Sequence, residues 1–400
     1  NNSYTSSFCA SYQRVRLNND ILGKKMVEKH ILYGIPHSLY TGRARSYLIK
    51  NRIPFNELSC GHESFKADIV PKAKLATIPV LKTTSGEVIR DGAAIIEHFE
   101  LANGRPCQPK GARQQTISHL FDLIGCEGLL RPAMHYRWNF PEENLEFLNY
   151  HFFNAQRAGP NRQEKTDYMM DRMRFAGRIF GVSDTNHNFI EELYMDFLQA
   201  LDQHFSAVPY LLGWKPCIGD FGLMAPMFAH LGRDPKPLAL MQREAIHVYR
   251  WVERMNRAES DTAEFFEAGH GYLEQDEIPE TLVKVLSILA EDLVPETQAA
   301  ALSINHWLAD NQPSHGTSAS RYLGKNKSMA EFTVRGEIIA AGAQPYRFFM
   351  LQKIQDGYLK FSKKDKLLVD DLLEQCGLKE MLDIKLTQRL GQEDNLEVWL

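Results

Sequence analysis

Three hydroxyl-bearing side chains, those of Ser38, Tyr40 and Thr41, lie close together in the sequence. They follow a short apolar run and precede a segment with helical periodicity, so they fall in a loop that leads into a helix. A hydroxyl can donate a hydrogen bond to an anion, and such a bond contributes about 1.5–3 kcal/mol. The free N–H groups and the dipole at a helix N-terminus also favour an anion. This loop is therefore suited to stabilise a negatively charged reactive group.

The cysteines and histidines indicate no metal or disulfide chemistry. Six cysteines are scattered along the chain and none of them forms a CxxC pair, which is typical of reduced thiols. The fourteen histidines include no HExxH motif and no Cys/His ligand cluster. We therefore expect no bound metal.

The elements around the hydroxyl loop must hold it in place. The predicted order is a buried strand at 31–33, a helix at 43–51, an extended segment at 53–58, a hairpin with strands at 78–81 and 88–89, and a helix at 93–99. A strand, helix, strand, hairpin and helix in this order are typical of a thioredoxin-like domain, with a right-handed parallel crossover at its start. Pro79 fits within this hairpin if its peptide bond is cis and the preceding backbone faces a ligand instead of a neighbouring strand.

Several motifs occur together within residues 29–103. They are Tyr33 at the end of the first strand, Ser38 in the loop, Arg43-x-Arg45 in the first helix, Ile78-Pro79, and Asp91 before Ala94-Ile95. This stretch resembles the N-terminal domain of the cytosolic glutathione S-transferases. The spacing from Ser38 to Arg43 is similar to that of the serine- and cysteine-type branches, the zeta and omega classes. The resemblance implies a thioredoxin-like, glutathione-binding domain followed by an all-helical domain.

The resemblance also implies a catalytic role for the hydroxyl loop. Ser38 falls at the position of the family's serine or cysteine, and it would stabilise the thiolate of glutathione. Tyr40 and Thr41 are alternatives for this donor, and Ser38 could instead only cap the helix. Because residue 38 is not cysteine, omega-type thiol exchange is disfavoured. Leu39 and Tyr40 replace the rest of the zeta-type Ser-Ser-Cys run, which argues against maleylacetoacetate isomerisation.

The remaining glutathione contacts are also implied by the resemblance. Ile78, which precedes Pro79, would pair its backbone with the cysteinyl unit, like a strand added to a sheet edge. Asp91 would lie near the γ-glutamyl ammonium, and Gly92 would offer a backbone donor where the family usually has a serine. Lys74 or Lys72 would reach the glycyl carboxylate, although either could be a solvated surface lysine.

The chain after this domain is predicted to be helical. A Gly/Pro-rich linker spans 104–111, and helical periodicity then continues through a predicted domain at 112–260. Asp220 lies at the start of the predicted helix 221–231, where it resembles the capping acid of the family's buried core helix. We therefore expect a structural role for Asp220.

A segment near 135–181 has no counterpart in the family pattern and is interpreted as an insertion with two helical runs. Its aromatic residues Tyr136 and Trp138 could line a substrate pocket. The alternative, which the sequence favours, is that they pack the insertion onto the helical domain.

The two ends of the chain carry no recognisable motif. Residues 1–28 are expected to form a polar arm, and 261–400 a mostly helical extension of unassigned role. Within the extension the pattern predicts helices at 281–293 and 296–308, a strand at 332–336, helices near 346–355 and 365–375, and a possible hairpin around 391–395.

Composition limits the remaining possibilities. The 400 residues predict two or three domains, and 44% hydrophobic and 24% charged residues are ordinary for a globular protein. A net charge of −4, without basic clusters, gives no indication of a nucleic-acid or membrane partner. We found no signal-peptide pattern and no apolar run of the roughly 18–20 residues that span a bilayer, so a cytoplasmic protein is expected.

The resemblance predicts an enzyme that activates glutathione, as co-substrate, for attack on a hydrophobic electrophile bound between the two domains. It also implies a homodimer. Two alternatives stay open: a non-catalytic binding or scaffold protein with the same fold, and a glutathione-dependent isomerase or thioether-cleaving enzyme.

Overall fold

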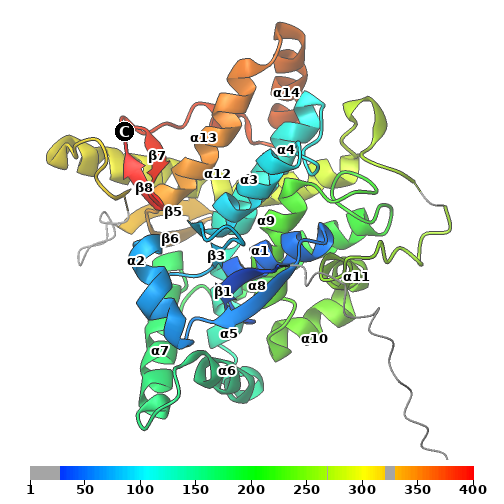
Figure 1. Cartoon of the computed structure of the whole chain (residues 1–400). Helices are drawn as coiled ribbons and strands as arrows, with labels where there is room; N and C mark the ends of the chain where they lie inside the picture. The colour runs from blue at the N-terminus through cyan, green and yellow to red at the C-terminus, as the bar shows by residue number, and fades with distance from the viewer. Residues whose placement is uncertain (1–27, 268, 320–328) are drawn as a thin grey trace, which may run out of the picture.

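The computed structural model describes residues 28–267, 269–319 and 329–400. Except for its last residue, the predicted arm 1–28 lies outside these described residues. The chain forms a thioredoxin-like N-terminal domain, a helical part and a mostly helical extension with two small hairpins (Figure 1).

The N-terminal domain has the expected alternation of strands and helices. Its elements are β1 (His30–Gly34), α1 (Leu39–Lys50), β2 (Phe55–Ser59), the π-helical turn η2 (Phe65–Ile69), α2 (Val70–Ala73), β3 (Val80–Lys82), β4 (Val88–Arg90) and α3 (Gly92–Ala102). The sheet order is β2-β1-β3-β4, with β1 parallel to β2 and β3 antiparallel to both of its neighbours. Leu32 and Leu81, paired at the centre of the sheet, are fully buried.

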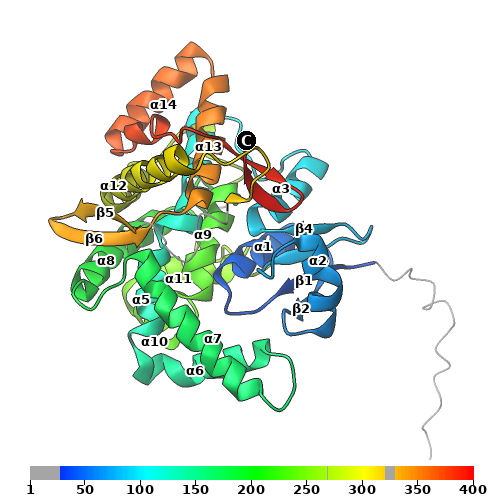
Figure 2. The same ribbon diagram turned by 90° about the vertical axis from the view of Figure 1, so that its left-hand side faces the viewer.

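The helical part follows the linker. Its elements are α4 (Ala112–Leu123), the π-helical turn η3 (Ile124–Gly128), α5 (Leu130–Trp138), α6 (Pro141–Ala155), α7 (Arg162–Ala176), η4 (Gly177–Phe180), α8 (His187–Phe205), α9 (Ile218–Ala229), α10 (Pro235–Glu244) and α11 (Ile246–Met255). Helices α6 and α7 correspond to the two helical runs of the predicted insertion. They pack on each other at the end of the molecule opposite to the extension (Figures 1 and 2).

The extension contributes helices and two hairpins. Its elements are η5 (Glu274–Asp276), α12 (Glu280–Asn311), β5 (Met329–Val334), β6 (Glu337–Gly342), α13 (Pro345–Lys360), α14 (Lys363–Gln375), η7 (Lys379–Leu382), β7 (Leu390–Glu393) and β8 (Leu396–Trp399). Helices α13 and α14 both pack on α4. The extension therefore packs directly on the helical domain.

The structure corrects the sequence prediction at two places in the extension. The two helices predicted at 281–293 and 296–308 are one continuous helix, α12, with Pro295 inside it. A proline removes one backbone hydrogen bond, but the apolar face of α12 is buried on both sides of Pro295, and this packing outweighs the loss. The strand predicted at 332–336 is one half of a hairpin, because β6, which the pattern missed, pairs with β5.

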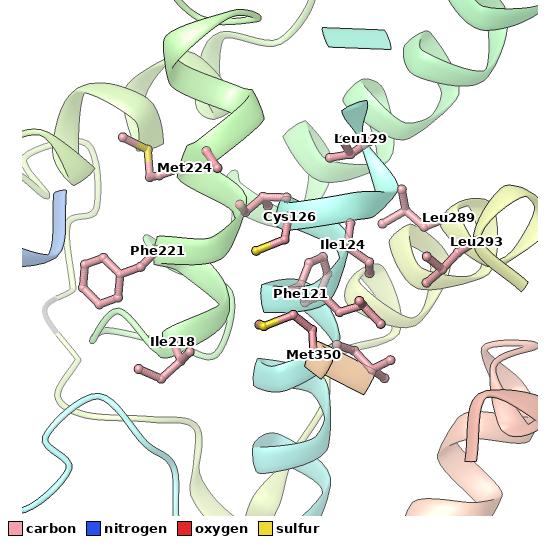
Figure 3. Close-up of a cluster of buried hydrophobic side chains, with 14 of the residues drawn as sticks. Phe121, Ile124, Cys126, Leu129, Ile218, Phe221, Met224, Leu289, Leu293 and Met350 are labelled. Carbon is pink, nitrogen blue, oxygen red and sulfur yellow. The ribbon is translucent and has the colours of Figure 1, made fainter. Parts of the chain in front are cut away.

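The main core is built around α4 and η3. Figure 3 shows their side chains between α9 on one side and α12 with α13 on the other. The buried residues drawn there include Phe121, Ile124, Cys126, Phe221, Met224, Leu289, Leu293 and Met350. Burial of each large apolar side chain contributes about 1.5–3 kcal/mol. The extension thus completes the same core that supports the N-terminal domain.

Two glycines allow η3 and α9 to approach closely. A Cβ atom added to Gly125 would lie 2.0 Å from the carbonyl oxygen of Gly222. We expect Gly125→Ala to lower the free energy of unfolding by about 1–3 kcal/mol, because the backbones must move apart. Urea denaturation measures the change. The matched control is Gly357→Ala in α13, where an added Cβ meets nothing within 4 Å and stability should rise by about 0.5–1 kcal/mol. Equal effects of the two substitutions would contradict the close-packing explanation.

Candidate active site

Strand register brings the predicted site residues to one end of the sheet. Tyr33 of β1 pairs with Val80 of β3, which pairs with Arg90 of β4. The loop after β1, the segment before β3 and the start of α3 therefore meet at this end, because β3 is antiparallel to both neighbours. The N–H of Asp91 donates to the carbonyl oxygen of Pro79 at 3.1 Å, which joins the last two segments directly.

Ser38 is the N-cap of α1. Its Oγ accepts a hydrogen bond from the N–H of Thr41 at 3.3 Å, so the capping role that the sequence allowed is present. Capping uses a lone pair and leaves the hydroxyl proton able to donate. In the described part of the chain, the N–H groups of Leu39 and Tyr40 have no hydrogen-bond acceptor. The loop thus offers one hydroxyl and two backbone donors at a helix N-terminus.

The two alternative hydroxyls are less favourably placed. The Tyr40 hydroxyl donates to the carbonyl oxygen of Cys126 at 3.5 Å, and burial, followed by the nearby Glu127 carboxylate, raises the pKa of Tyr40 well above its ordinary value. The phenol is therefore neutral, and its proton points toward η3. The Thr41 hydroxyl is fully buried and has no hydrogen-bond partner among the described residues. Ser38 remains the best candidate donor.

Ile78 has the backbone geometry expected of a ligand-binding position. The Ile78–Pro79 peptide bond is cis, as the sequence pattern requires. Strand pairing begins only at Val80, and neither the N–H nor the C=O of Ile78 has a hydrogen-bond partner among the residues that the structure describes. Ile78 can therefore accept and donate one hydrogen bond each to an extended ligand.

Asp91 begins α3 in a conformation that is unusual for a residue with a side chain. Its φ of 84° lies in the left-handed region, and such backbone conformations are frequent at functional sites. Its Oδ1 accepts from the N–H groups of Ala93 and Ala94 at 2.8 and 3.3 Å. The hydroxyl of Tyr346, from α13, lies 3.0 and 3.1 Å from the two carboxylate oxygens. The carboxylate predicted to hold an ammonium group thus has a partner from the extension.

Gly92 and Lys74 complete the predicted set. The N–H of Gly92 has no acceptor among the described residues, so the backbone donor is available. A side chain at Gly92 would come within 3.3 Å of the Tyr40 carbonyl oxygen. Lys74 forms an ion pair with Asp394 of the β7–β8 turn, at 2.8 Å. Lys72, the alternative, contributes its carbonyl oxygen to Asn395 in the same turn.

Three arginines hold the loop that carries Ser38. The consecutive carbonyl oxygens of residues 35–37 accept hydrogen bonds from Arg45 at 3.2 Å, Arg233 at 3.4 Å and Arg137 at 3.0 Å, in that order. These arginines come from α1, from the segment before α10 and from α5. With its carbonyl groups held by three separate elements, the loop has little freedom to change conformation.

Arg137 is the most deeply buried of the three. It forms two hydrogen bonds with Asp234, at 2.6 and 2.9 Å, and a third with the Ala229 carbonyl oxygen at 2.7 Å. The side chains of Arg137 and Asp234 are 4% and 0% exposed. This buried ion pair ties the helical domain to the Ser38 loop.

The structure does not support the predicted pocket role of Tyr136 and Trp138. Both side chains are buried, with Tyr136 stacked on Phe140 and Trp138 packed against Phe152. Side chains enclosed by their own domain cannot line an open pocket, so the packing alternative describes them better. Asp220 has the geometry of a structural residue: it is fully buried and accepts hydrogen bonds from the N–H groups of Cys217 and Leu211 and from the Trp251 indole.

Comparison with known proteins identifies the domain that carries this site. Residues 32–106 match the family model described as glutathione S-transferase, N-terminal domain. This match shows a glutathione S-transferase N-terminal domain within residues 32–106. The match does not separate the zeta from the omega class, so the class stays a prediction. No curated protein matches the chain.

Solved structures similar to this chain include two glutathione transferases and a β-etherase. Glutathione transferase GSTFuA3 from Phanerochaete chrysosporium is 15% identical, with 58% of this chain and 98% of that one covered and a TM-score of 0.42. The β-etherase LigF from Sphingobium sp. strain SYK-6 is 16% identical, with 59% and 98% covered and a TM-score of 0.41. CsGST63524 of Ceriporiopsis subvermispora, solved in complex with glutathione, is 15% identical, with 58% and 98% covered and a TM-score of 0.40.

Sequence reasoning missed several residues of this candidate site. Arg137, Arg233, Tyr346 and the β7–β8 turn all reach it from outside the matched domain. No local motif marks them, because each is brought to the site only by folding.

Within the described residues, no helix combines the length and the apolar character needed to cross a membrane.

Proposed function

We propose that this protein is a glutathione transferase that activates the thiol of glutathione for attack on a hydrophobic electrophile. One observation supports the proposal: the Ser38 hydroxyl and the N–H groups of Leu39 and Tyr40 lie at the same end of the sheet as the backbone of Ile78, and these backbone groups have no partner among the described residues. The hydroxyl and N–H groups of the loop suit an anion, and the backbone of Ile78 suits the extended peptide that carries this anion.

Activation requires ionising a weakly acidic thiol. A free thiol with a pKa of about 8.5 is only roughly 3% ionised at pH 7. Lowering its pKa to about 6.5 would ionise roughly 75% and requires about 2.7 kcal/mol of preferential stabilisation of the thiolate. One hydrogen bond from Ser38, contributing about 1.5–3 kcal/mol, together with the N-terminus of α1 is of the right size. The arrangement therefore supports thiolate stabilisation without a metal.

The peptide would be anchored along β3 and the start of α3. The N–H and C=O of Ile78 would pair with the cysteinyl unit, Asp91 would attract the γ-glutamyl ammonium, and the N–H of Gly92 would donate to the γ-glutamyl carboxylate. Lys74 would attract the glycyl carboxylate. The three arginines on residues 35–37 would act as positioning residues, because they keep Ser38 fixed relative to the peptide.

Calorimetric titration with glutathione tests the proposal. We expect the full chain to bind glutathione in the millimolar range or tighter, with loss of binding when Asp91 is replaced by asparagine. Leu101→Ala, an exposed change at the far end of α3, is the control and should bind like the wild type. The test also needs a variant that lacks the contacts of Tyr346 with Asp91 and of Asp394 with Lys74. If neither the wild type nor this variant binds glutathione, the transferase proposal fails.

A binding or scaffold protein is the second candidate. The observation that favours it is the engagement of Asp91 by Tyr346 and of Lys74 by Asp394, since these contacts satisfy two groups that glutathione would use. A scaffold would show no turnover of an aryl halide at any glutathione concentration, whether or not it binds the peptide.

We also propose that the protein forms a homodimer, as the family resemblance implies. Because α13 and α14 cover α4, such a dimer must use surface that the extension leaves free. Sedimentation velocity at micromolar concentration should show a dimer, and a single monomeric species would contradict this proposal.

A further inference from the structure

The extension contacts the candidate peptide site at both of its ends. At one end, the Tyr346 hydroxyl donates to the Asp91 carboxylate. At the other, the Asp394 carboxylate pairs with Lys74. Figure 2 shows the terminal hairpin, in red, beside α3 and β4. Among the described residues, the backbone N–H and C=O of Ile78 and the N–H of Gly92 are left without partners.

The turn of the hairpin is joined closely to the edge of the sheet. The Asn395 side chain accepts from the N–H of Arg90 at 3.0 Å and donates to the carbonyl oxygens of Val88 and Lys72 at 2.9 and 3.2 Å. The Asn395 carbonyl oxygen accepts from Arg90 Nε at 2.5 Å. The side-chain amide thus hydrogen-bonds the backbone of β4 much as an added strand would.

Beyond the turn, the hairpin is held more firmly. The Arg90 guanidinium forms two hydrogen bonds with Glu397, at 2.7 and 2.6 Å, and these side chains are only 9% and 11% exposed. Trp399 is fully buried. The Lys74–Asp394 pair is different, because its side chains are 40% and 73% exposed. Exposed ion pairs are weak, so the turn is held at the site mainly by the hydrogen bonds of Asn395. The turn can leave the site by breaking these bonds while Glu397 and Trp399 keep the base of the hairpin in place.

The extension contacts match the chemistry of the ligand at both ends. Asp91 receives a hydrogen-bond donor, as it would from an ammonium group, and Lys74 receives a carboxylate, as it would from a peptide terminus. We propose that Tyr346 and the β7–β8 turn are intramolecular competitors for the ends of the peptide, so that glutathione binds only when the extension releases them. This inference rests on the proposed function.

A competitor of this kind lowers the apparent affinity without changing the site itself. The apparent Kd equals the intrinsic Kd divided by the fraction of molecules in the open form, so a closed form favoured by about ten to one raises Kd roughly tenfold. By linkage, glutathione must weaken the hold of the extension by the same factor. Anything that binds the released turn would then increase the affinity for glutathione.

Substitutions that remove the two matching contacts test the proposal. Tyr346→Phe removes the hydroxyl, and Asp394→Asn removes the carboxylate while keeping a residue that tolerates the turn's φ of 46°. Glu393→Gln is a charge-matched control, because it removes one negative charge from the same hairpin at a residue that pairs with His315 and not with the site. Thermal unfolding of each variant verifies that the fold is retained.

The readouts are calorimetric titration with glutathione and hydrogen exchange of the hairpin. We expect the double variant Tyr346→Phe, Asp394→Asn to bind glutathione about tenfold more tightly than the wild type, with Glu393→Gln unchanged. Saturating glutathione should speed amide exchange of the wild-type turn at residues 393–396.

The other outcomes separate the two proposals. Equal affinity of the wild type and the double variant would overturn competition and leave the transferase proposal intact. Weaker binding by Tyr346→Phe would also overturn it, because Tyr346 would then be a ligand contact. If even the double variant binds no glutathione, the transferase proposal fails and the competition inference fails with it.

Discussion

Ser38→Ala is expected to lower kcat/KM for an aryl halide roughly 10- to 150-fold, because the lost hydrogen bond to the thiolate is worth about 1.5–3 kcal/mol. The same change should raise the pKa of the bound glutathione thiol toward that of the free thiol. The rate should therefore recover in part at high pH, where the thiol ionises without help. Absorbance of the thiolate and the pH profile of kcat/KM measure both effects.

The control for Ser38→Ala must account for the lost helix cap. Ser362 caps α14 in the same way, accepting from the N–H of Asp365 at 3.1 Å, and it lies far from the site in the sequence. Ser362→Ala should cost the same roughly 0.5–2 kcal/mol of stability and leave turnover unchanged. Full activity of Ser38→Ala would instead move the catalytic role to Tyr40 or Thr41.

Arg137→Met is expected to destabilise the protein by about 3–5 kcal/mol, because it leaves the Asp234 carboxylate buried without its partner. It also leaves the carbonyl oxygens of His37 and Ala229 without their donor. Urea denaturation gives the change in free energy of unfolding, provided that the slope with denaturant is unchanged. At temperatures where the variant is still folded, kcat should fall as well, since the Ser38 loop loses one of its three arginine contacts.

A double-mutant cycle separates the ion pair from the rest of the effect. Adding Asp234→Asn to Arg137→Met removes the unpaired charge and should restore part of the stability. The recovery should be absent if the second change is Glu143→Gln, whose carboxylate pairs with Lys236 at the surface. If the two changes are additive, the pair is not coupled and the explanation is wrong.

Local motifs were enough to predict the N-terminal domain and to place the candidate site residues at one end of its sheet. Ser38 and Asp91 are the N-caps of α1 and α3, Ile78 lies just before β3, and strand order alone brings these positions together. The sequence pattern was least reliable where the burial of a side chain decides its role. Aromatic residues such as Tyr136 and Trp138 occur both in pocket walls and in cores, and only their neighbours in space distinguish the two roles.

Pro295 shows the same limit for secondary structure. A proline in a helical pattern predicts a break, yet α12 continues through it because both halves bury apolar side chains against the same core. Local preference at one residue is worth a few kcal/mol at most, and it is outweighed when packing on both sides favours a single helix.

The sequence by itself determined the resemblance of residues 29–103 to a glutathione S-transferase N-terminal domain, the thioredoxin-like order of elements and the residues that could hold a thiolate and its peptide. Only the tertiary structure decided what surrounds them. Tyr346 contacts Asp91, and Asn395 contacts Arg90, at sequence separations of 255 and 305 positions. Side-chain contacts over such separations leave no periodicity or motif in the sequence, because they depend on how the whole chain packs and not on the preferences of neighbouring residues.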